Sequence, residues 1–376
     1  MKRITIIFFL LTLSLSGCVE YQEIEKLDLI NARGVDDAED GLLETTLVSF
    51  QFTGQSNDIS NTTSEHGRTL KGTLDKAEEK SVFKMAPGKT KVTIYGKKMA
   101  EKGILPLLDT QSRDARINDN MYLAVSSTTA KEILNLNEEQ KLPINIGQYL
   151  YELIYGHSHD HNFPRETLQN FIRTYYVSGQ DNILPLFEIN KGRPKLGGIA
   201  VFRGDKMVGE LDLTDGTFIN LINRNVKEER LEISLPLEPF KAYVEDKTSL
   251  QHNKLETAYV ITDGKSKTKL VDVNNLSYQT KMNIKLRLTE ISAEIELDRN
   301  IIELLEEEVE KKVKNHFKVL LSKLQDLKAD SFGFGRYYTG TKKGKHITSE
   351  EWHQMFPKIN VDFKVDVEII NHGMEE

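Results

Sequence analysis

Two regular patterns of apolar positions stand out in the last part of the chain. Between residues 302 and 327, apolar side chains recur every three or four positions, which predicts a long helix with one apolar stripe. Between residues 359 and 369, apolar and polar side chains alternate strictly, which predicts a strand with one buried and one solvated face. We expect the helix to cover the sheet that contains this strand, because the buried face needs a cover. A coiled-coil seam or a partner-binding face is the alternative role for the stripe.

Two further segments show strand patterns. Residues 282–288 alternate, and the pattern resumes in the opposite phase over residues 291–297, which indicates two strands or one bulged strand. Residues 197–211 hold two apolar runs around an Arg-Gly-Asp-Lys turn at 203–206, which predicts a β-hairpin. Because the alternating strands expose one face, we expect the C-terminal sheet to be antiparallel.

The first half of the chain mixes shorter signals. The polar stretch 54–67, rich in Ser, Asn and Thr, is expected to be a loop. Strands are predicted at 42–52, 92–95 and 121–126, and helices at 73–83 with Thr73 as N-cap, 96–102 closed by Gly103, 128–136 capped by Thr128, 144–154 and 165–177. The predicted fold class is therefore α+β: multi-domain, with mixed and antiparallel sheets packed with helices, and a C-terminal antiparallel sheet covered by a long helix.

The first residues resemble a targeting segment. Lys2 and Arg3 precede an apolar run over residues 4–15, which would span ~18 Å as a helix and so falls short of the ~30 Å bilayer core. This pattern is typical of a secretory signal peptide. The sequence Leu-Ser-Gly-Cys at 15–18 resembles a bacterial lipobox, in which the cysteine takes a lipid and becomes the mature N-terminus.

Cys18 is the only cysteine of the chain, and it lies at the lipobox position. We expect it to carry a lipid anchor, with acyl chains such as palmitate holding the protein on a membrane, because several chains together bind firmly. An ordinary signal peptide with a chance cysteine is the alternative. A lone cysteine also excludes an internal disulfide, a cysteine-based zinc site and an iron–sulfur cluster.

Length and charge limit the number of domains and the classes of function. The 376 residues correspond to two or three domains. A net charge of −7, from 50 basic and 57 acidic side chains, makes a general nucleic-acid binder a poor candidate. The predicted division is a signal peptide (1–17), a lipidated tether (18–26), an N-terminal α/β domain (27–194), a small middle domain with the hairpin (195–250) and a C-terminal α+β domain (251–376).

The chain shows no evident catalytic machinery. Residues 87–90 end like a phosphate-binding loop but lack its first glycine, Gly333 and Gly335 lack the third glycine of a dinucleotide fingerprint, and no Gly-x-Ser-x-Gly occurs. Three histidines in one segment, His157, His159 and His161, could bind Zn²⁺ or Cu²⁺. A solvated surface loop is the favoured interpretation, because no second cluster supplies the remaining ligands. We expect no cofactor, no metal and no enzymatic activity.

The chain resembles the Ger(x)C family (GerAC-like proteins), the C-subunit lipoproteins of nutrient germinant receptors in endospore-forming bacteria. The stretch from Cys18 to Ile24 is similar to the family's Cys-Trp-Asp-x-x-Glu-Ile opening, with Val19 and Glu20 in place of Trp and Asp. By residue type the other matching positions are structural, because glycines supply backbone freedom and Trp352 with Phe356 would bury one helical face. These motif positions are Gly34, Asp36, Gly103, Arg113, Asp114, Gly198, Phe202, Gly209, Asp330, Phe332, Gly333, Gly335 and Trp352.

The resemblance implies a receptor subunit rather than an enzyme. Members act with integral-membrane A and B subunits, anchored on the outer face of the inner spore membrane, and the complex starts spore germination in response to small nutrients. We expect this chain to act by protein–protein contact. A free-standing extracytoplasmic solute-binding lipoprotein is the alternative, although its usual parallel sheets fit the alternating strands poorly. A metal-dependent hydrolase at the histidine segment is a third, weaker hypothesis.

The histidine segment gives a first prediction. If the three histidines are only solvated, His159→Ala should leave function and thermal stability unchanged, with or without a chelator. Thermal melts of both proteins, with and without EDTA, check this. A large loss that depends on the chelator would contradict it and would support a metal site.

Overall fold

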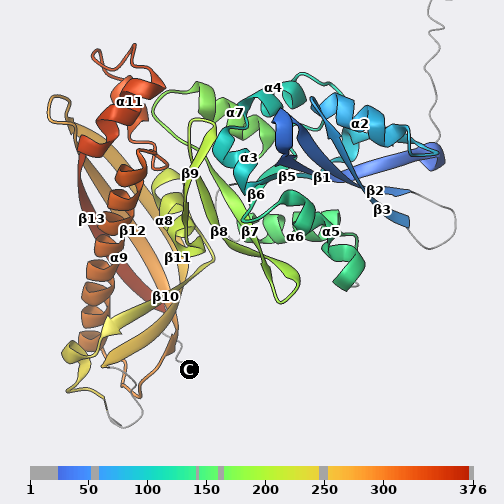
Figure 1. The fold of residues 1–376 in the computed structure, drawn as a ribbon. Coiled ribbons are helices and arrows are strands. Elements are labelled where there is room, and N and C mark those ends of the chain that lie inside the picture. The colour runs from blue at the N-terminus through green and yellow to red at the C-terminus, as the bar shows by residue number, and fades with distance from the viewer. Residues whose placement is uncertain (1–23, 52–58, 141–143, 160–164, 245–252, 372–376) are drawn as a thin grey trace, which may run out of the picture.

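The computed structural model describes residues 24–51, 59–140, 144–159, 165–244 and 253–371. Within these residues the strands form two sheets, which lie side by side in Figure 1. The nine-stranded sheet has the order β3-β2-β1-β5-β6-β7-β8-β9, with β4 beside β1, and the four-stranded sheet has the order β10-β11-β12-β13. The predicted α+β class with mixed sheets is confirmed.

The first sheet has a parallel centre with antiparallel ends. β1, β5, β6 and β7 run parallel, whereas β2 and β3 extend one end antiparallel, and β8 and β9 extend the other. β5 and β6 are buried along their whole length, as parallel strands covered on both faces must be. The bounds are β1 Leu27–Asp37, β2 Leu43–Gln51, β3 Ile59–Gly67, β4 Lys84–Ala86, β5 Val92–Gly96, β6 Tyr122–Ser126, β7 Ile183–Asn190, β8 Arg193–Arg203 and β9 Lys206–Leu211.

Helices cover both faces of this sheet (Figure 1). Side chains of α5 and α6 belong to the core cluster on one face, and those of α3, α4 and α7 belong to the cluster on the other. α2 packs on a third, smaller cluster with β1 and β2. The bounds are α2 Leu70–Glu78, α3 Lys97–Lys102, α4 Leu105–Ser112, α5 Ala130–Gln140, α6 Ile146–His159 and α7 Leu168–Tyr176.

The polar stretch 54–67 is not a loop throughout, so that prediction is wrong for its second part. β3 occupies this part and pairs with β2 in register from Ile59 to Gly67. The Ser and Thr side chains suit an edge strand that meets water on one side, and Thr46 bonds Ser64 across the pair at 2.9 Å. An edge strand that meets water needs no apolar run on its exposed side. The segment therefore lacks the apolar pattern that marks a strand, and its polar composition indicated a loop.

Two predicted helix caps are also wrong. α2 begins at Leu70 after Thr69, which has an extended backbone and accepts the Gly72 amide at 3.0 Å through its hydroxyl. Thr73 lies inside this helix, where its buried hydroxyl donates to the Leu70 carbonyl. α5 begins two residues later than predicted, at Ala130, and the Thr129 hydroxyl accepts the Glu132 amide at 3.1 Å. In both cases another threonine nearby, four residues before Thr73 and one residue after Thr128, provides the hydroxyl. Composition alone does not distinguish between such threonines.

The second sheet differs from the expectation in one pair of strands. β10 Glu229–Pro236, β11 Lys254–Asp272 and β12 Ser277–Ile291 are antiparallel neighbours, but β13 Asn360–Asn371 pairs with β12 in parallel. The reason is α9, Arg299–Leu327, which lies between the two strands in the chain. Its 29 residues span ~43 Å, so it returns the chain to the end of the sheet at which β12 starts.

The phase shift predicted within 282–297 has two causes. The register of β12 against β11 shifts between Leu288 and Glu290, which is the bulge that the sequence allowed for. The strand then ends at Ile291, so a strand over the whole of 291–297 is wrong. The buried Ala293 and Ile295 lie in the irregular connection to α9 and fill the core without strand pairing.

The apolar stripe of α9 packs on its own sheet, as expected, rather than forming a coiled-coil seam. Phe317 lies 5.3 Å from Phe363 of β13, ring centre to ring centre. Asp298 caps the helix by accepting the Ile301 amide at 2.9 Å. α8, Leu213–Asn223, leads from the first sheet to the second, and α10 Gly335–Thr339 and α11 Ser349–Met355 follow α9. The buried positions of the stripe include Ile301, Leu305, Val309, Val313, Phe317, Leu320 and Leu324.

Two glutamates of α9 bond the outer edge of β13. Glu310 accepts the Val367 amide at 3.0 Å, and Glu306 accepts the Ile369 amide at 2.7 Å. The two glutamates are four residues apart on the helix, and the two amides are two residues apart on the strand. These separations cover similar distances, so both contacts form together. An uncovered edge would present these amides to another chain, so the glutamates both join the helix to the sheet and close its edge.

The predicted middle segment can be placed on this frame. Residues 195–250 contribute β8 and β9 to the first sheet and β10 to the second, with α8 between them. The division of the chain into domains stays a prediction. No helix in the described ranges is long and apolar enough to cross a membrane.

The edge contacts give a prediction for stability. We expect Glu306→Ala with Glu310→Ala to lower the free energy of unfolding by about 1–3 kcal/mol, because two amides lose charged acceptors at half-buried positions. Urea unfolding followed by circular dichroism measures this. Glu307→Ala is the matched control, since that exposed side chain forms a surface pair with Lys311, at 3.9 Å, and such pairs contribute little. Equal stability of the double variant and the control would contradict the role of the edge contacts.

Candidate functional site

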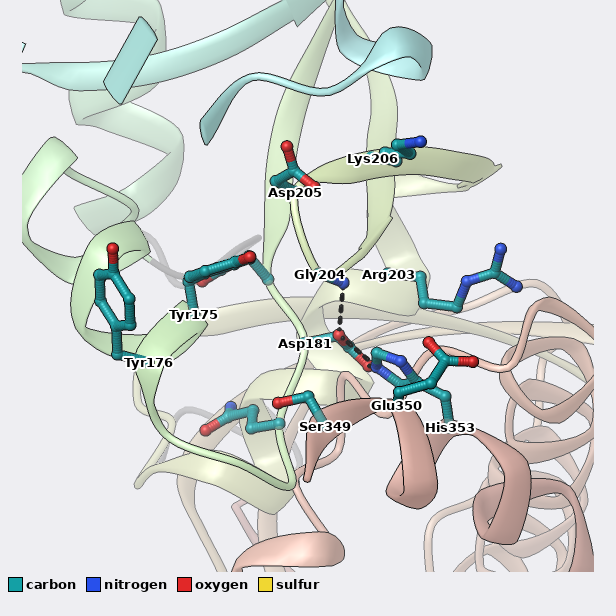
Figure 2. A pocket seen from close by; sticks show the side chains of 12 residues that line it. Tyr175, Tyr176, Asp181, Arg203, Gly204, Asp205, Lys206, Ser349, Glu350 and His353 are labelled. Atoms are coloured by element: carbon teal, nitrogen blue, oxygen red, sulfur yellow. Dashed lines mark hydrogen bonds and ion pairs between the residues drawn. The ribbon is translucent and has the colours of Figure 1, made fainter. Parts of the chain in front are cut away.

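A cavity of about 540 Å³ lies where the two sheets meet. Its walls come from the end of α7 and the loop after it, from the β8–β9 turn, and from α11 (Figure 2). Segments from both halves of the chain therefore build this one site. The lining residues are Tyr175, Tyr176, Gln180, Asp181, Asn182, Arg203, Gly204, Asp205, Lys206, Ser349, Glu350 and His353.

The Asp181–His353 pair forms one wall of the cavity. His353 Nε2 lies 3.0 Å from both carboxylate oxygens of Asp181, and both residues are buried. Asp181 also accepts the Gly204 amide at 2.9 Å, so it binds α11 and the β8–β9 turn together (Figure 2). These hydrogen bonds offset the cost of burying a carboxylate.

Asp330 lies behind this pair and organises the turn after α9. Its carboxylate accepts the amides of Gly333 and Gly335 at 2.8 Å each and the Trp352 indole N–H at 2.9 Å. The Asp330 amide donates to Asp181 Oδ2 at 2.8 Å, and the Asp181 amide donates to the Asp330 carbonyl at 3.0 Å. Burial raises the pKa of Asp330 to about 7, although the donated hydrogen bonds oppose that shift.

Two glycines let the two halves approach closely here. A Cβ on Gly335 would lie 2.3 Å from the Gly179 Cα atom and 2.6 Å from the Trp352 ring. Gly333 has φ +74°, in the left-handed region that other residues rarely adopt. The sequence-based expectation that these glycines serve backbone geometry agrees with the contacts. The contacts add that Gly335 abuts the first half of the chain.

The predicted aromatic positions form the core around this turn. Trp352 and Phe356 are fully buried, with ring centres 6.3 Å apart. Phe332 is also fully buried and lies edge-on to Phe334 at 5.7 Å. The structure thus brings together the motif positions of the C-terminal part, from Asp330 to Trp352.

Three predicted hairpin residues join the same region from the other side. Phe202 packs edge-on against Phe171 at 5.3 Å. A Cβ on Gly209 would lie 2.7 Å from the Leu327 side chain at the end of α9, and a Cβ on Gly198 would lie 2.6 Å from the Leu211 carbonyl of the paired strand. The absence of a side chain at Gly209 thus permits α9 to contact the hairpin.

The α3–α4 turn is tied to the hairpin through Asp205. Gly103 has φ +121°, and a Cβ there would lie 2.7 Å from the Asp205 carboxylate. That carboxylate accepts the Leu105 amide at 3.2 Å. This contact joins the β8–β9 turn, which forms one wall of the cavity, to the start of α4.

Arg113 and Asp114 lie at the end of α4, away from the network. The hydrogen bonds from Arg116 hold the pKa of Asp114 at about 2. Arg113 is exposed at the C-cap of the helix. The structure therefore gives Asp114 a local role in the turn after α4.

Gly34 and Asp36 serve a separate structural purpose. Asp36 accepts the Ala130 amide at 2.8 Å and the Lys131 amide at 2.9 Å, so it caps α5 from a distant strand. A Cβ on Gly34 would lie 2.8 Å from the Leu134 side chain of the same helix. Both residues hold α5 against β1.

Sequence reasoning missed Asp181 and His353. Asp181 lies in a loop with no periodic signal, and His353 is a lone histidine beside Trp352 in a short helix. Neither position carries a motif, and only the fold brings them within 3.0 Å. A buried polar pair of this kind is visible only once burial is known.

The histidine segment is only partly a loop. His157 and His159 lie in α6, so the loop interpretation is wrong for these two positions, and His161 lies outside the described residues. Among the described residues, no group of three or more His, Cys, Asp or Glu side chains is arranged to hold a metal. Cys18 and the residues before it also lie outside the described ranges.

The buried carboxylate gives a pH prediction. The pKa of Asp330 is raised to about 7 in the folded protein, above an unfolded value of about 3.9. Its contribution to stability is therefore complete below pH ~4 and falls as the pH rises toward 7. We expect the stability of the wild type relative to Asp330→Asn to decrease from pH 4 to pH 7. Denaturant titrations of both proteins across this pH range measure the difference in their free energies of unfolding. A wild type that becomes more stable relative to the variant as the pH rises would contradict the prediction.

Comparison with known proteins identifies the family. Residues 20–189 match the model of the spore germination protein N-terminal domain, and residues 197–373 match that of the spore germination B3/GerAC-like C-terminal domain. The chain is 24 % identical over 381 residues to the spore germination protein GerQC of Bacillus cereus, with all of both chains covered. It is 20 % identical to the putative spore germination protein YfkR of Bacillus subtilis (strain 168), covering 94 % of this chain and 92 % of that one.

A solved structure shares the fold. The crystal structure of the GerBC protein matches with a TM-score of 0.53 and 17 % identity, over 93 % of this chain and 100 % of that one. Both halves of the chain match spore germination models, and the whole chain aligns end to end with a spore germination protein. The chain therefore belongs to the Ger(x)C family of spore germination proteins.

Proposed function

We propose that this protein is the lipid-anchored C subunit of a nutrient germinant receptor. It is required for spore germination in response to small nutrients, and it acts by contact with integral-membrane A and B subunits rather than by catalysis. The observation that carries this proposal is the match of both halves of the chain to spore germination domain models. The lipobox pattern at residues 15–18 supports the anchor, which would hold the protein on the outer face of the inner spore membrane.

The junction between the sheets supports a role in contact. Asp181, His353 and Asp330 hold segments from both halves in one arrangement. A subunit that works by presenting a surface needs its parts fixed relative to one another. Arg203 and Glu350 are exposed around the cavity, where a partner could reach them.

The receptor role is tested with spores that lack this gene. Dipicolinate release is followed over a panel of amino acids, sugars and nucleosides. Loss of the response to one nutrient, with the other responses intact, supports the role and identifies the nutrient. Unchanged responses to the whole panel would count against it, and calorimetry of the purified protein with the same nutrients would then test the solute-binding alternative.

The anchor gives a separate prediction. Complementing the deletion with Cys18→Ala should give weak germination, because the protein loses its attachment to the membrane. Val19→Ala is the matched control, since it changes the next residue and keeps the cysteine. Germination rates and membrane fractionation of the spores are measured together. Full rescue by a protein found outside the membrane fraction would contradict the anchor.

A further inference from the structure

The open face of the second sheet carries a row of lysines. In β11, β12 and β13, Thr268, Thr280 and Phe363 are buried on the side of α9, and the alternation of side chains exposes the lysines beside them on the other side. Lys267 is the register partner of Lys281, and Lys281 is the register partner of Lys364. Neighbouring strands lie ~4.8 Å apart, so these three side chains form one line across the sheet.

This arrangement is unfavourable within the chain itself. Like charges on directly opposed strand positions destabilise a sheet. Lys269, on the same side of β11, lies opposite the uncharged Gln279 and adds a fourth cation. We call Lys267, Lys269, Lys281 and Lys364 the lysine face. A binding role for the face would explain why the chain retains this repulsion.

Carboxylates pair with the lysines next to the lysine face, but they pair with few of the lysines within it. On neighbouring positions, Lys265 pairs with Asp263 at 2.6 Å and Lys285 pairs with Glu368 at 2.8 Å. Within the face, Lys364 reaches Asp362 at 4.0 Å, and no ion pair in the described part of the chain involves the other three lysines.

A loop next to the face adds further positive charge. Lys342, Lys343 and Lys345 are exposed in the loop before α11, and Lys343 bonds Asn274 in the β11–β12 turn. Both the loop and this turn lie at the upper left of Figure 1. This concentration of cations contrasts with the net charge of −7 for the whole chain.

We propose that the lysine face binds the anionic phospholipid headgroups of the membrane that carries the protein. This inference rests on the proposed lipid anchor, which keeps the face near that membrane. The charges are complementary, and lysines act as point charges that suit many mobile phosphates rather than one planar ligand. The cations are spread across an open sheet face, which matches the extended surface of a bilayer.

The orientation follows from the distribution of charge. β13 also carries Asp362, Asp366 and Glu368 on the open face, which offset its single lysine there. The three lysines of the face that form no ion pair with described residues, Lys267, Lys269 and Lys281, lie on β11 and β12. The sheet therefore meets the headgroups through β11 and β12, with the acidic part of β13 turned away from the membrane.

Chemical labelling of lysines tests the contact in the lipidated full chain. The protein is incorporated into vesicles of phosphatidylcholine, with or without about 30 % phosphatidylglycerol, then acetylated and analysed by mass spectrometry. Labelling of Lys267, Lys269 and Lys281 should fall about fivefold with phosphatidylglycerol, and about 0.5 M salt should remove the protection. Lys312 and Lys318, exposed on α9, should react equally in both vesicles. Equal labelling of the lysine face in both vesicles would overturn the proposal.

Matched variants provide a second readout. The face variant carries Lys267→Gln, Lys269→Gln and Lys281→Gln, and the α9 variant carries Lys312→Gln, Lys314→Gln and Lys318→Gln, so each loses three charges. The wild type and the α9 variant should show phosphatidylglycerol-dependent protection of Lys343, and the face variant should lose it. Equal protection in both triple variants would overturn the proposal.

The outcomes separate the face from the anchor and from a protein partner. Flotation with vesicles of phosphatidylcholine alone tests the anchor, because the lysine face has no anionic lipid to bind there. Protein that fails to float contradicts the anchor, while the phosphatidylglycerol-dependent labelling still tests the face. Protection that needs the A and B subunits and is independent of phosphatidylglycerol would assign the face to an acidic protein surface and overturn the lipid proposal.

Discussion

Two buried aspartates, Asp181 and Asp330, fix how the two sheets of the protein sit together. Each donates its own amide to the other residue, at 3.0 and 2.8 Å, so the loop before β7 and the turn after α9 are joined twice. His353 hydrogen-bonds one buried carboxylate, and Trp352 donates an N–H to the other. Breaking one of these contacts leaves a buried polar atom without a partner, which is costly. The halves therefore keep one relative position.

The close approach of the halves depends on small residues as much as on polar contacts. Gly335 lies against Gly179, and Gly209 lies against Leu327, at distances that leave no room for a Cβ. These contacts bring the backbones together so that the aspartate network can form. One cluster of buried apolar side chains also runs through both halves, and the cavity lies beside the aspartate network, between segments of the two halves.

Local patterns predicted the elements whose periodicity follows from burial, such as α9, β13 and the β8–β9 hairpin. Predictions failed where polar composition or pairing direction decides the outcome: β3 is a polar edge strand, and the parallel pairing of β13 depends on the path of α9. The sequence indicated only part of the site. Asp330 belongs to a motif, whereas Asp181 and His353 are 172 positions apart in the sequence and meet only in the fold. Patterns among neighbours carry no information about a contact of that range.

The parallel pairing of β12 and β13 also has a consequence for the order in which the protein folds. β13 is the last described strand, and its partner β12 is synthesised about 80 residues earlier. The second sheet cannot close until the ribosome has delivered β13, which follows β10, β11, β12 and α9 in the chain. Until then the apolar side of α9 has only part of its cover, and a chaperone would meet it exposed. Loss of the 12 residues of β13 would therefore harm the folding of this half far more than their number suggests.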